Sequence, residues 1–282
     1  MSKKYWSLVL VLIIIYGLVS YWYFVNVDNQ DSNLNYNSLQ KINKNESNFL
    51  FAVYGDSANS NGRFGRLINN LNGKNVLFSL DNGDLTTSGT KRQFGYFIAN
   101  MKQLRAPVLT NMGNHDLNNG SDESNYVIVF GNTDYSFTEK NSYFIVFDDA
   151  KADVNNAQMN WLEGELEKSQ NYKYRFVFMH IPIYDPRYNA AGKGLCLSNS
   201  TTAKTLNALF DRYNVTMLFT SHIHGYFRGV WGKTPFITTG GAGSPLSKPL
   251  NNGSNSNENY FYNYVLVNVT DGGVSYKVVG YS

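Results

Sequence analysis

Each of the four histidines in this sequence lies shortly after an apolar run. His115 lies in the segment MGNHD at 112–116, His180 ends the run FMH, and His222 and His224 form the pair in SHIHG. The chain has only these four histidines among its 282 residues. Imidazole is both a metal ligand and a proton carrier near neutral pH. This placement therefore predicts that the four side chains share one chemical site.

Two carboxylates and one amide occupy the same kind of position. Asp56 follows the run FLFAVY, Asp84 follows NVLFSL, and Asn114 follows PVLTNM. Carboxylate and amide oxygens suit Mg, Mn and Fe, whereas imidazole suits Zn, Fe and Mn. Together with the histidines these donors exceed the four that a tetrahedral ion takes. They indicate two divalent ions about 3.5–4 Å apart, bridged by a carboxylate and a water.

The segments around these residues predict alternating strands and helices. Between the strands, residues 91–104 repeat apolar side chains at helical spacing. The same alternation continues further along the chain, with expected strands at 142–149, 174–180 and 215–222 and expected helices at 157–169 and 202–213. Residues 233–282 read as strands and turns, with the hairpin signal Asp271-Gly272. We expect one α/β domain over 48–282, with the site beyond the carboxyl ends of five strands.

Taken singly, each of these polar residues reads most often as an ordinary turn former, helix cap or surface side chain. Those readings would leave all four histidines at strand ends by accident. Their joint placement argues against a structural ectodomain that has no site.

The N-terminal segment differs from the rest of the chain. Residues 5–25 carry no charge, exceed the roughly 20 residues that a spanning helix needs, and have Tyr or Trp at both ends. No small-residue cleavage site or lipobox cysteine follows, which favours an uncleaved signal anchor over a cleaved signal peptide. Lys3 and Lys4 favour a cytoplasmic stub over 1–4 and a domain on the extracytoplasmic side of the cell membrane. Residues 26–47 are mostly polar and show no regular spacing of apolar residues, which predicts a tether.

Composition excludes some classes of function. The net charge of +3 comes without a Lys/Arg block, so nucleic acid is not an expected partner. Cys196 is the single cysteine, which excludes an intrachain disulfide framework and a cysteine-based zinc site.

The order of these motifs resembles the calcineurin-like metallophosphoesterase superfamily over about residues 50–280. The motifs are Gly55-Asp56, Gly83-Asp84, Gly113-Asn114-His115-Asp116, His180 and His222-Ile223-His224. Their layout is closest to that of purple-acid-phosphatase-like members. The resemblance implies a β-sandwich flanked by helices that hydrolyses phosphoesters with two divalent ions, Mn, Fe, Zn or Mg.

The resemblance also implies a role for each site residue. Asp84 is expected to bridge two ions. The remaining metal ligands are expected to be Asn114, His180 and His222 for one ion and Asp56 and His224 for the other. His115 is expected to act on the phosphate without binding metal, and Asp116 to orient it.

One ligand of the family pattern is missing. The family commonly has histidine two residues after the first aspartate, where this chain has Ala58. Purple acid phosphatases use a tyrosine three residues after the second aspartate, where this chain has Thr87. We expect one weakly held ion, unless Asn59 completes its shell. A metal-impaired pseudoenzyme that acts as a tethered binding module is the alternative.

The substrate stays open among phosphate monoesters, diesters, nucleotides and lipid phosphates. The loop at 184–200 follows His180 and is expected to border the site. Tyr184 and Arg187 are either substrate contacts or part of a solvated loop.

Overall fold

The computed structural model describes most of the chain after residue 31. The described residues are 32–42, 48–58, 62–188, 193–249 and 259–282, together with 11, 14, 15 and 17. None of the helices they form is both long and apolar enough to cross a membrane. The predicted anchor at 5–25 lies almost wholly outside the described residues, so it stays a prediction.

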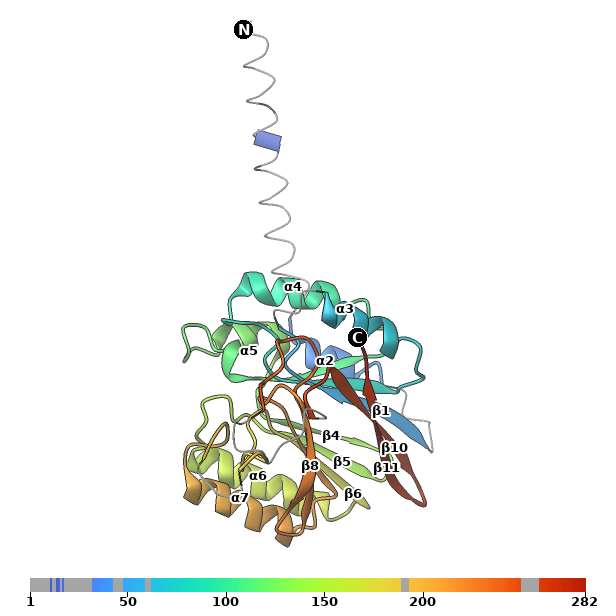
Figure 1. Ribbon diagram of the computed structural model, residues 1–282, viewed down its shortest axis with the longest axis vertical. Helices are drawn as coiled ribbons and strands as arrows, with labels where there is room; N and C mark the ends of the chain where they lie inside the picture. Colours follow the sequence, from blue (N-terminus) through green and yellow to red (C-terminus); the bar gives the residue numbers. More distant parts are fainter. Residues whose placement is uncertain are drawn as a thin grey trace, which may run out of the picture.

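Two mixed sheets form the centre of the folded part (Figure 1). The first has the order β11-β10-β1-β2-β3. Its strands are β1 (Phe49–Tyr54), β2 (Phe78–Asn82), β3 (Val108–Asn111), β10 (Asn263–Thr270) and β11 (Gly273–Gly280). The second has the order β4-β5-β6-β7-β9-β8. Its strands are β4 (Tyr135–Glu139), β5 (Ser142–Val146), β6 (Tyr174–Phe178), β7 (Met217–Thr220), β8 (Tyr226–Trp231) and β9 (Thr234–Thr239).

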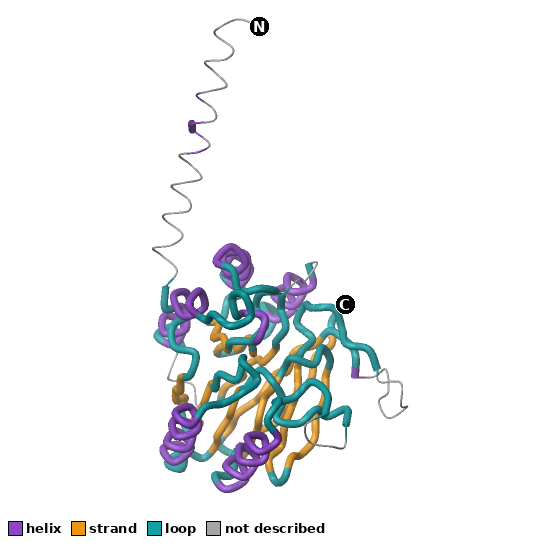
Figure 2. The backbone as a smooth tube through the Cα atoms, turned by 90° about the vertical axis from the view of Figure 1, so that its left-hand side faces the viewer, coloured by secondary structure: helices purple, strands orange, loops and turns teal. Residues whose placement is uncertain are grey.

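Helices cover the outer face of each sheet (Figure 2). Those packed on the first sheet are α3 (Arg63–Leu71), α4 (Lys91–Met101) and α5 (Ser124–Phe130). Those packed on the second are α6 (Asn156–Ser169) and α7 (Ser200–Arg212). The strands of each sheet that carry site residues are parallel to one another, so their carboxyl ends lie at one edge. The sequence-based expectation of sheets packed between helices is confirmed.

The alternation of side chains along β1 explains why its run of apolar residues is unbroken. Phe51 and Val53 face the second sheet, whereas Ala52 and Tyr54 face the helices. Both faces of the strand are therefore buried, as in the parallel sheets of α/β proteins. Phe51 stacks on Phe78 with 5.2 Å between ring centroids and meets rings of the opposite sheet edge-on. These aromatic contacts join the two sheets into one core.

The described part of the chain contains elements that the sequence reading did not predict as such. They include β4, β8, α5 and the short helix α2 (Leu34–Leu39). The helix α2 lies inside the segment 26–47 that was expected to be a polar tether.

The α2 helix is packed on the domain rather than extended as a tether, which corrects that part of the expectation. The β3 strand is at the edge of its sheet, so its backbone groups need another partner. Asn35 is buried and supplies one: its Oδ1 accepts from Thr110 N at 2.9 Å, and its Nδ2 donates to Thr110 O at 3.2 Å. The periodicity of the sequence does not show this contact, because it depends on a single amide side chain.

We expect Asn35→Ala to lower the free energy of unfolding by about 1–3 kcal/mol, because the buried N–H of Thr110 loses its acceptor. Urea denaturation measures the change. Asn37→Ala is the matched control, since Asn37 is exposed and bonds only within its own segment. Equal stabilities for the two variants would show that the contact between Asn35 and β3 does not stabilise the domain.

Candidate dinuclear metal centre

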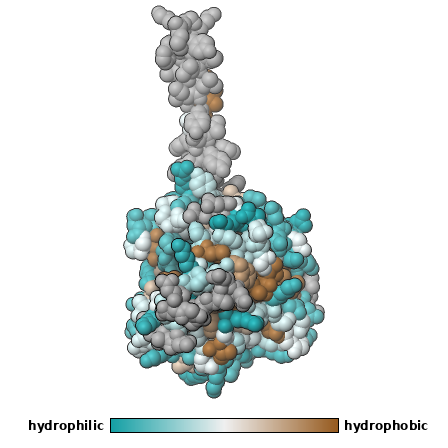
Figure 3. Space-filling view, in the orientation of Figure 1, coloured by the Kyte–Doolittle hydropathy of each residue, from teal (hydrophilic) through white to brown (hydrophobic). Residues whose placement is uncertain are grey.

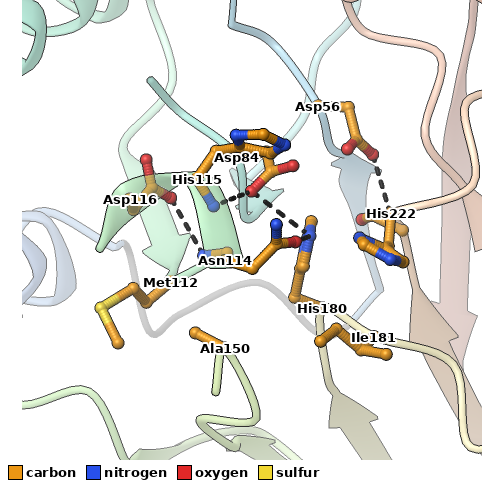
Figure 4. A network of polar contacts seen from close by, with 12 residues as sticks. Asp56, Asp84, Met112, Asn114, His115, Asp116, Ala150, His180, Ile181 and His222 are labelled. Atoms are coloured by element: carbon orange, nitrogen blue, oxygen red, sulfur yellow. Dashed lines mark hydrogen bonds and ion pairs between the residues drawn. The ribbon is translucent and has the colours of Figure 1, made fainter. Parts of the chain in front are cut away.

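Five strand ends bring the predicted site residues together. The strands β1, β2, β3, β6 and β7 end at residues 54, 82, 111, 178 and 220. The side chains that follow them are Asp56, Asp84, Asn114, His115, His180, His222 and His224. Figure 4 shows six of them converging between the two sheets. The arrangement places donors from both sheets at one edge of the sandwich.

Three of the candidate ligands have left-handed backbone conformations. The φ angle is 61° at Asp56, 56° at Asp84 and 65° at His222. Non-glycine residues rarely adopt this region, although Asp, Asn and His enter it more readily than others. Such strain persists where the surrounding structure fixes it, and it is often found at functional sites. Each turn aims a side chain across the edge instead of along its strand.

Two glycines allow the loops to approach one another. Gly83 has a φ of 97°, and a Cβ there would strike the imidazole of His180. Gly113 has an extended backbone, but a Cβ there would strike the backbone and carboxylate of Asp84. The requirement for glycine in the GNHD motif is thus close packing against Asp84, rather than an unusual backbone angle.

The described residues contain two groups of His and Asp side chains that could hold metal ions. One group is Asp84, His180 and His222, and the other is Asp56, Asp84 and His224. Within each group the candidate donor atoms lie within 4.8 Å of one another. The Oδ1 atom of Asn114 adds a donor to the first group, 3.2 Å from His180 Nε2. Asp84 is shared, so it is placed to bridge two ions.

Backbone carbonyls fix the orientation of two imidazoles. Nδ1 of His180 lies 2.9 Å from Asn82 O, and Nδ1 of His224 lies 2.7 Å from Pro245 O. A carbonyl only accepts hydrogen bonds, so each Nδ1 carries the proton. In the neutral ring, Nε2 then presents a lone pair towards the carboxylates. Such a carbonyl partner commonly orients a metal-ligating histidine.

These lone pairs face carboxylate oxygens. Nε2 of His180 lies 3.4 Å from Asp84 Oδ1, and Nε2 of His224 lies 3.2 Å from Asp56 Oδ1. Asp56 Oδ1 is buried and forms no hydrogen bond. Two acceptors in contact repel each other unless a proton or a cation lies between them. The donor set therefore fits divalent cations.

The charges of the site favour protons where metal ions would otherwise bind. Burial opposes the charged form of His180, but Asp84 and Asp56 raise its pKa to about 10. Burial likewise opposes the charge on His224, but Asp56 raises its pKa to about 9. Burial and the neighbouring His180 lower the pKa of His222 to about 3. In the metal-free protein at neutral pH, His222 is neutral while the other two ligands are protonated.

Asn82 connects the two sheets below the site, and the sequence reading did not single it out. Its Nδ2 donates to Met179 O at 2.6 Å and to Phe219 O at 3.3 Å, both at the ends of strands in the other sheet. Its carbonyl O accepts from His180 Nδ1 and from Ser221 Oγ. In the sequence Asn82 belongs to DNGD, which reads as a turn.

Asp149 is a second residue that the sequence reading missed. Its carboxylate accepts from His180 N at 2.8 Å and from Ile181 N at 2.9 Å. Asp149 follows the end of β5 in the run FDD. This position after a strand is the sequence feature by which Asp149 could have been recognised as a candidate site residue. Asp149 fixes the backbone that carries His180.

His115 and Asp116 have different surroundings. His115 is exposed, and its Nδ1 lies 3.3 Å from Thr87 O. Asp116 is fully buried, and its carboxylate accepts from the N–H groups of Gly113, Leu85 and Thr86 at 2.9–3.1 Å. The described contacts include no hydrogen bond between Asp116 and the His115 ring, so the expected orienting role stays a prediction. Asp116 holds the GNHD loop against the loop that carries Asp84.

A cavity of about 270 Å³ lies beside His115. It is lined mainly by hydroxyl and amide side chains: Thr87, Ser88, Thr90, Asn114, Asn118 and Asn119. His115 is the only ionisable side chain among its lining residues, so this side of the site is polar but carries little charge.

The missing ligand position borders a different cavity. Ala58 lines a second cavity, of about 330 Å³, together with Phe64, Leu85 and Phe97. The position where purple acid phosphatases have tyrosine is Thr87, whose Oγ1 accepts from Gln93 Nε2 at 2.6 Å. Asn59 lies outside the described residues, so its expected part in the shell stays a prediction.

Among the described residues of the loop at 184–200, Arg187 forms a two-pronged ion pair with buried Asp185, and Tyr184 packs on Trp231.

A two-sheet α/β sandwich with a shared carboxylate between two His/Asp groups defines the metallophosphoesterase class of fold and site. The chain belongs to the calcineurin-like phosphoesterase family, whose model matches residues 49–226. The family predicted from the motifs is confirmed. A comparison with curated proteins gives no match.

Solved structures of the same fold include proteins of different kinds. GAP50, the anchor in the inner membrane complex of Plasmodium, has a TM-score of 0.66 at 16% identity, over 83% of this chain and 85% of that chain. Purple acid phosphatase PPD1 from yellow lupin has a TM-score of 0.65 at 15% identity, over 83% of this chain and 52% of that chain. TT1561 of Thermus thermophilus has a TM-score of 0.51 at 10% identity, over 81% of this chain and 98% of that chain. This chain thus spans about half of the lupin enzyme, and at these identities the likeness shows the fold.

We expect divalent metal binding at pH 7.5 to release roughly two protons per chain, because the pKa values of about 10 at His180 and about 9 at His224 lie above that pH. Metal affinity should therefore rise with pH up to about 9–10. Titration calorimetry in buffers of different ionisation enthalpy counts the protons. Binding without proton release would show that these two imidazoles do not give up protons to the metal, which would contradict protonated ligands in the metal-free protein.

We expect Ala58→His to raise the metal retained after dialysis towards two ions per chain. The cavity beside Ala58 leaves space for a larger side chain, and a histidine nitrogen at this position is the ligand that the family pattern commonly supplies. Elemental analysis of the dialysed proteins measures the retained metal. Ala58→Leu is the control for volume without a donor. Two tightly held ions in the unaltered protein would refute a weakened site.

Proposed function

We propose that this protein hydrolyses phosphoesters at the Asp84 centre with two divalent ions. The observation that carries the proposal is the pair of His/Asp groups that share the buried Asp84 carboxylate. When bound there, two ions would lower the pKa of a water and neutralise charge on the phosphate. Mn, Fe, Zn and Mg are all compatible with these oxygen and nitrogen donors.

The chain's own groups set the geometry of that reaction. The carbonyls of Asn82 and Pro245 hold the Nε2 atoms of His180 and His224 towards the metal positions. The N–H of His115 donates to Asp84 Oδ1 at 2.9 Å, which fixes the bridging carboxylate. Precise orientation of ligands by such outer contacts matters for metal affinity and activity.

His115 supplies the proton chemistry. Its Nδ1–H is directed at Thr87 O, which leaves Nε2 as the atom that faces away from this carbonyl. Nε2 of the protonated ring would stabilise charge on the phosphate and protonate the departing alcohol oxygen. The polar cavity beside His115 would receive the alcohol part of the ester. A hydroxyl- and amide-lined cavity favours an uncharged alcohol that forms hydrogen bonds, from a small molecule or a lipid headgroup.

The test of this function is a panel of phosphate monoesters and diesters assayed with the full chain while the divalent metal is varied. Hydrolysis should depend on metal and should be lost in Asp84→Asn, which keeps a residue tolerant of the left-handed backbone. Stoichiometric metal binding without hydrolysis of any member would favour a binding module instead. That second candidate rests on Ala58, where the family's usual ligand is absent.

We expect His115→Ala to lower kcat by about 10²–10⁴-fold while the metal content stays near that of the unaltered protein. The variant removes a proton donor and leaves every proposed metal ligand in place. Steady-state kinetics and elemental analysis on the same samples provide the measurement. Loss of both ions in the variant would place His115 among the ligands.

The uncharged segment at 5–25 supports a further part of the proposal, namely that the enzyme is anchored in the cell membrane with its domain on the extracytoplasmic side. The described positions 11, 14, 15 and 17 within that segment are helical, which agrees with a helical anchor.

A further inference from the structure

The two short helices α2 and α5 share a surface that no described element covers. They pack against each other, and Gly131 at the end of α5 contacts Asn33 at the start of α2. Their sequences, LNYNSL and SNYVIVF, contain no charged residue. Figure 3 shows that hydrophobic and hydrophilic areas lie side by side on the face of the domain that it presents.

Large apolar side chains are exposed on this surface. Tyr36 on α2 is 56% exposed, and Val127 and Ile128 on α5 are 40% and 52% exposed. The opposite side of α5 buries Tyr126 and Phe130 in the core. A helix with apolar side chains on both sides is normally buried on both sides. The outward side of α5 therefore indicates an apolar surface that contacts something else.

The course of the chain indicates what contacts this apolar surface. Residue 32 starts the first described segment of the folded part, and residue 25 ends the uncharged segment. At about 3.3–3.6 Å per residue, the intervening chain spans at most about 25 Å. The contact between Asn33 and Gly131 places this entry point at the end of α5, one turn from Ile128. A bilayer that held residues 5–25 would lie within about 25 Å of this entry point.

We infer that Tyr36, Val127 and Ile128 form a docking surface that rests on the bilayer carrying the N-terminal anchor. This inference depends on the proposed membrane anchoring, but it does not depend on catalysis. Apolar side chains enter the headgroup boundary at little cost, and tyrosine is enriched at that depth. The absence of charge on both helices removes the desolvation cost that an ion would bring. The docked domain would have one fixed face towards the lipid.

The test uses the full chain in phosphatidylcholine vesicles. Cys196→Ser removes the single native cysteine, and Ile128→Cys introduces one that is labelled with an environment-sensitive nitrobenzoxadiazole. Val230→Cys on β8 is the matched control, because Val230 is 61% exposed and lies on another element. A nitroxide on the acyl chains of the lipid quenches labels that reach the bilayer.

We expect a blue-shifted and quenched label at 128 and an unquenched label at 230. Adding Val127→Asp to the chain labelled at 128 should abolish the quenching while the chain still floats with the vesicles. A chain that floats with vesicles but has an unquenched label at 128 overturns the docking surface and leaves the anchor intact. A chain that does not float overturns the anchoring itself, and the docking surface with it.

A second copy of the chain is the competing occupant. Energy transfer between two labels at 128 on different chains, with no quenching by the nitroxide lipid, would assign the surface to a dimer and overturn the inference. Melting curves for every labelled chain exclude unfolding as the cause of a change at position 128.

Discussion

The site depends on one constraint, which is that the ends of two separate sheets must stay in register. The amide of Asn82 meets this constraint, because it donates to the ends of β6 and β7 while its backbone belongs to β2. The backbone carbonyl of Asn82 simultaneously fixes the proton on Nδ1 of His180. A shift of one sheet against the other would separate Asp84 from the imidazoles that face it. The aromatic core between the sheets resists that shift over a larger area.

The same geometry makes the metal-free site electrostatically unfavourable unless two of its imidazoles carry an extra proton. Fixed carbonyl partners turn the lone pairs of two imidazoles towards buried carboxylates, and left-handed turns at Asp56, Asp84 and His222 hold these groups in place. Protons relieve the repulsion at neutral pH, and divalent ions would take their place on binding. Backbone strain and buried charged groups are thus concentrated where the chemistry is proposed to occur.

The α5 helix connects this site with the surface proposed to meet the membrane. Asn125 near its start donates to Gly89 O at 2.9 Å, and the loop containing Gly89 borders the cavity beside His115. The other side of the helix presents Val127 and Ile128 to the outside. Contact of α5 with lipid would therefore act on a segment that helps to shape the polar side of the site, which would matter if the substrate is a lipid phosphate.

The sequence by itself determined the family, the two-sheet fold and the identity of the candidate ligands, because strand periodicity and strand-end motifs are local signals. It did not reveal Asn82, Asp149 or the docking of Asn35 on β3, since each depends on a side chain meeting a backbone group from a distant part of the chain. The contacts of Asp116 with Leu85 and Thr86 were not visible in the sequence for the same reason. Which loop a carboxylate binds is decided only when the strands that carry both loops are side by side.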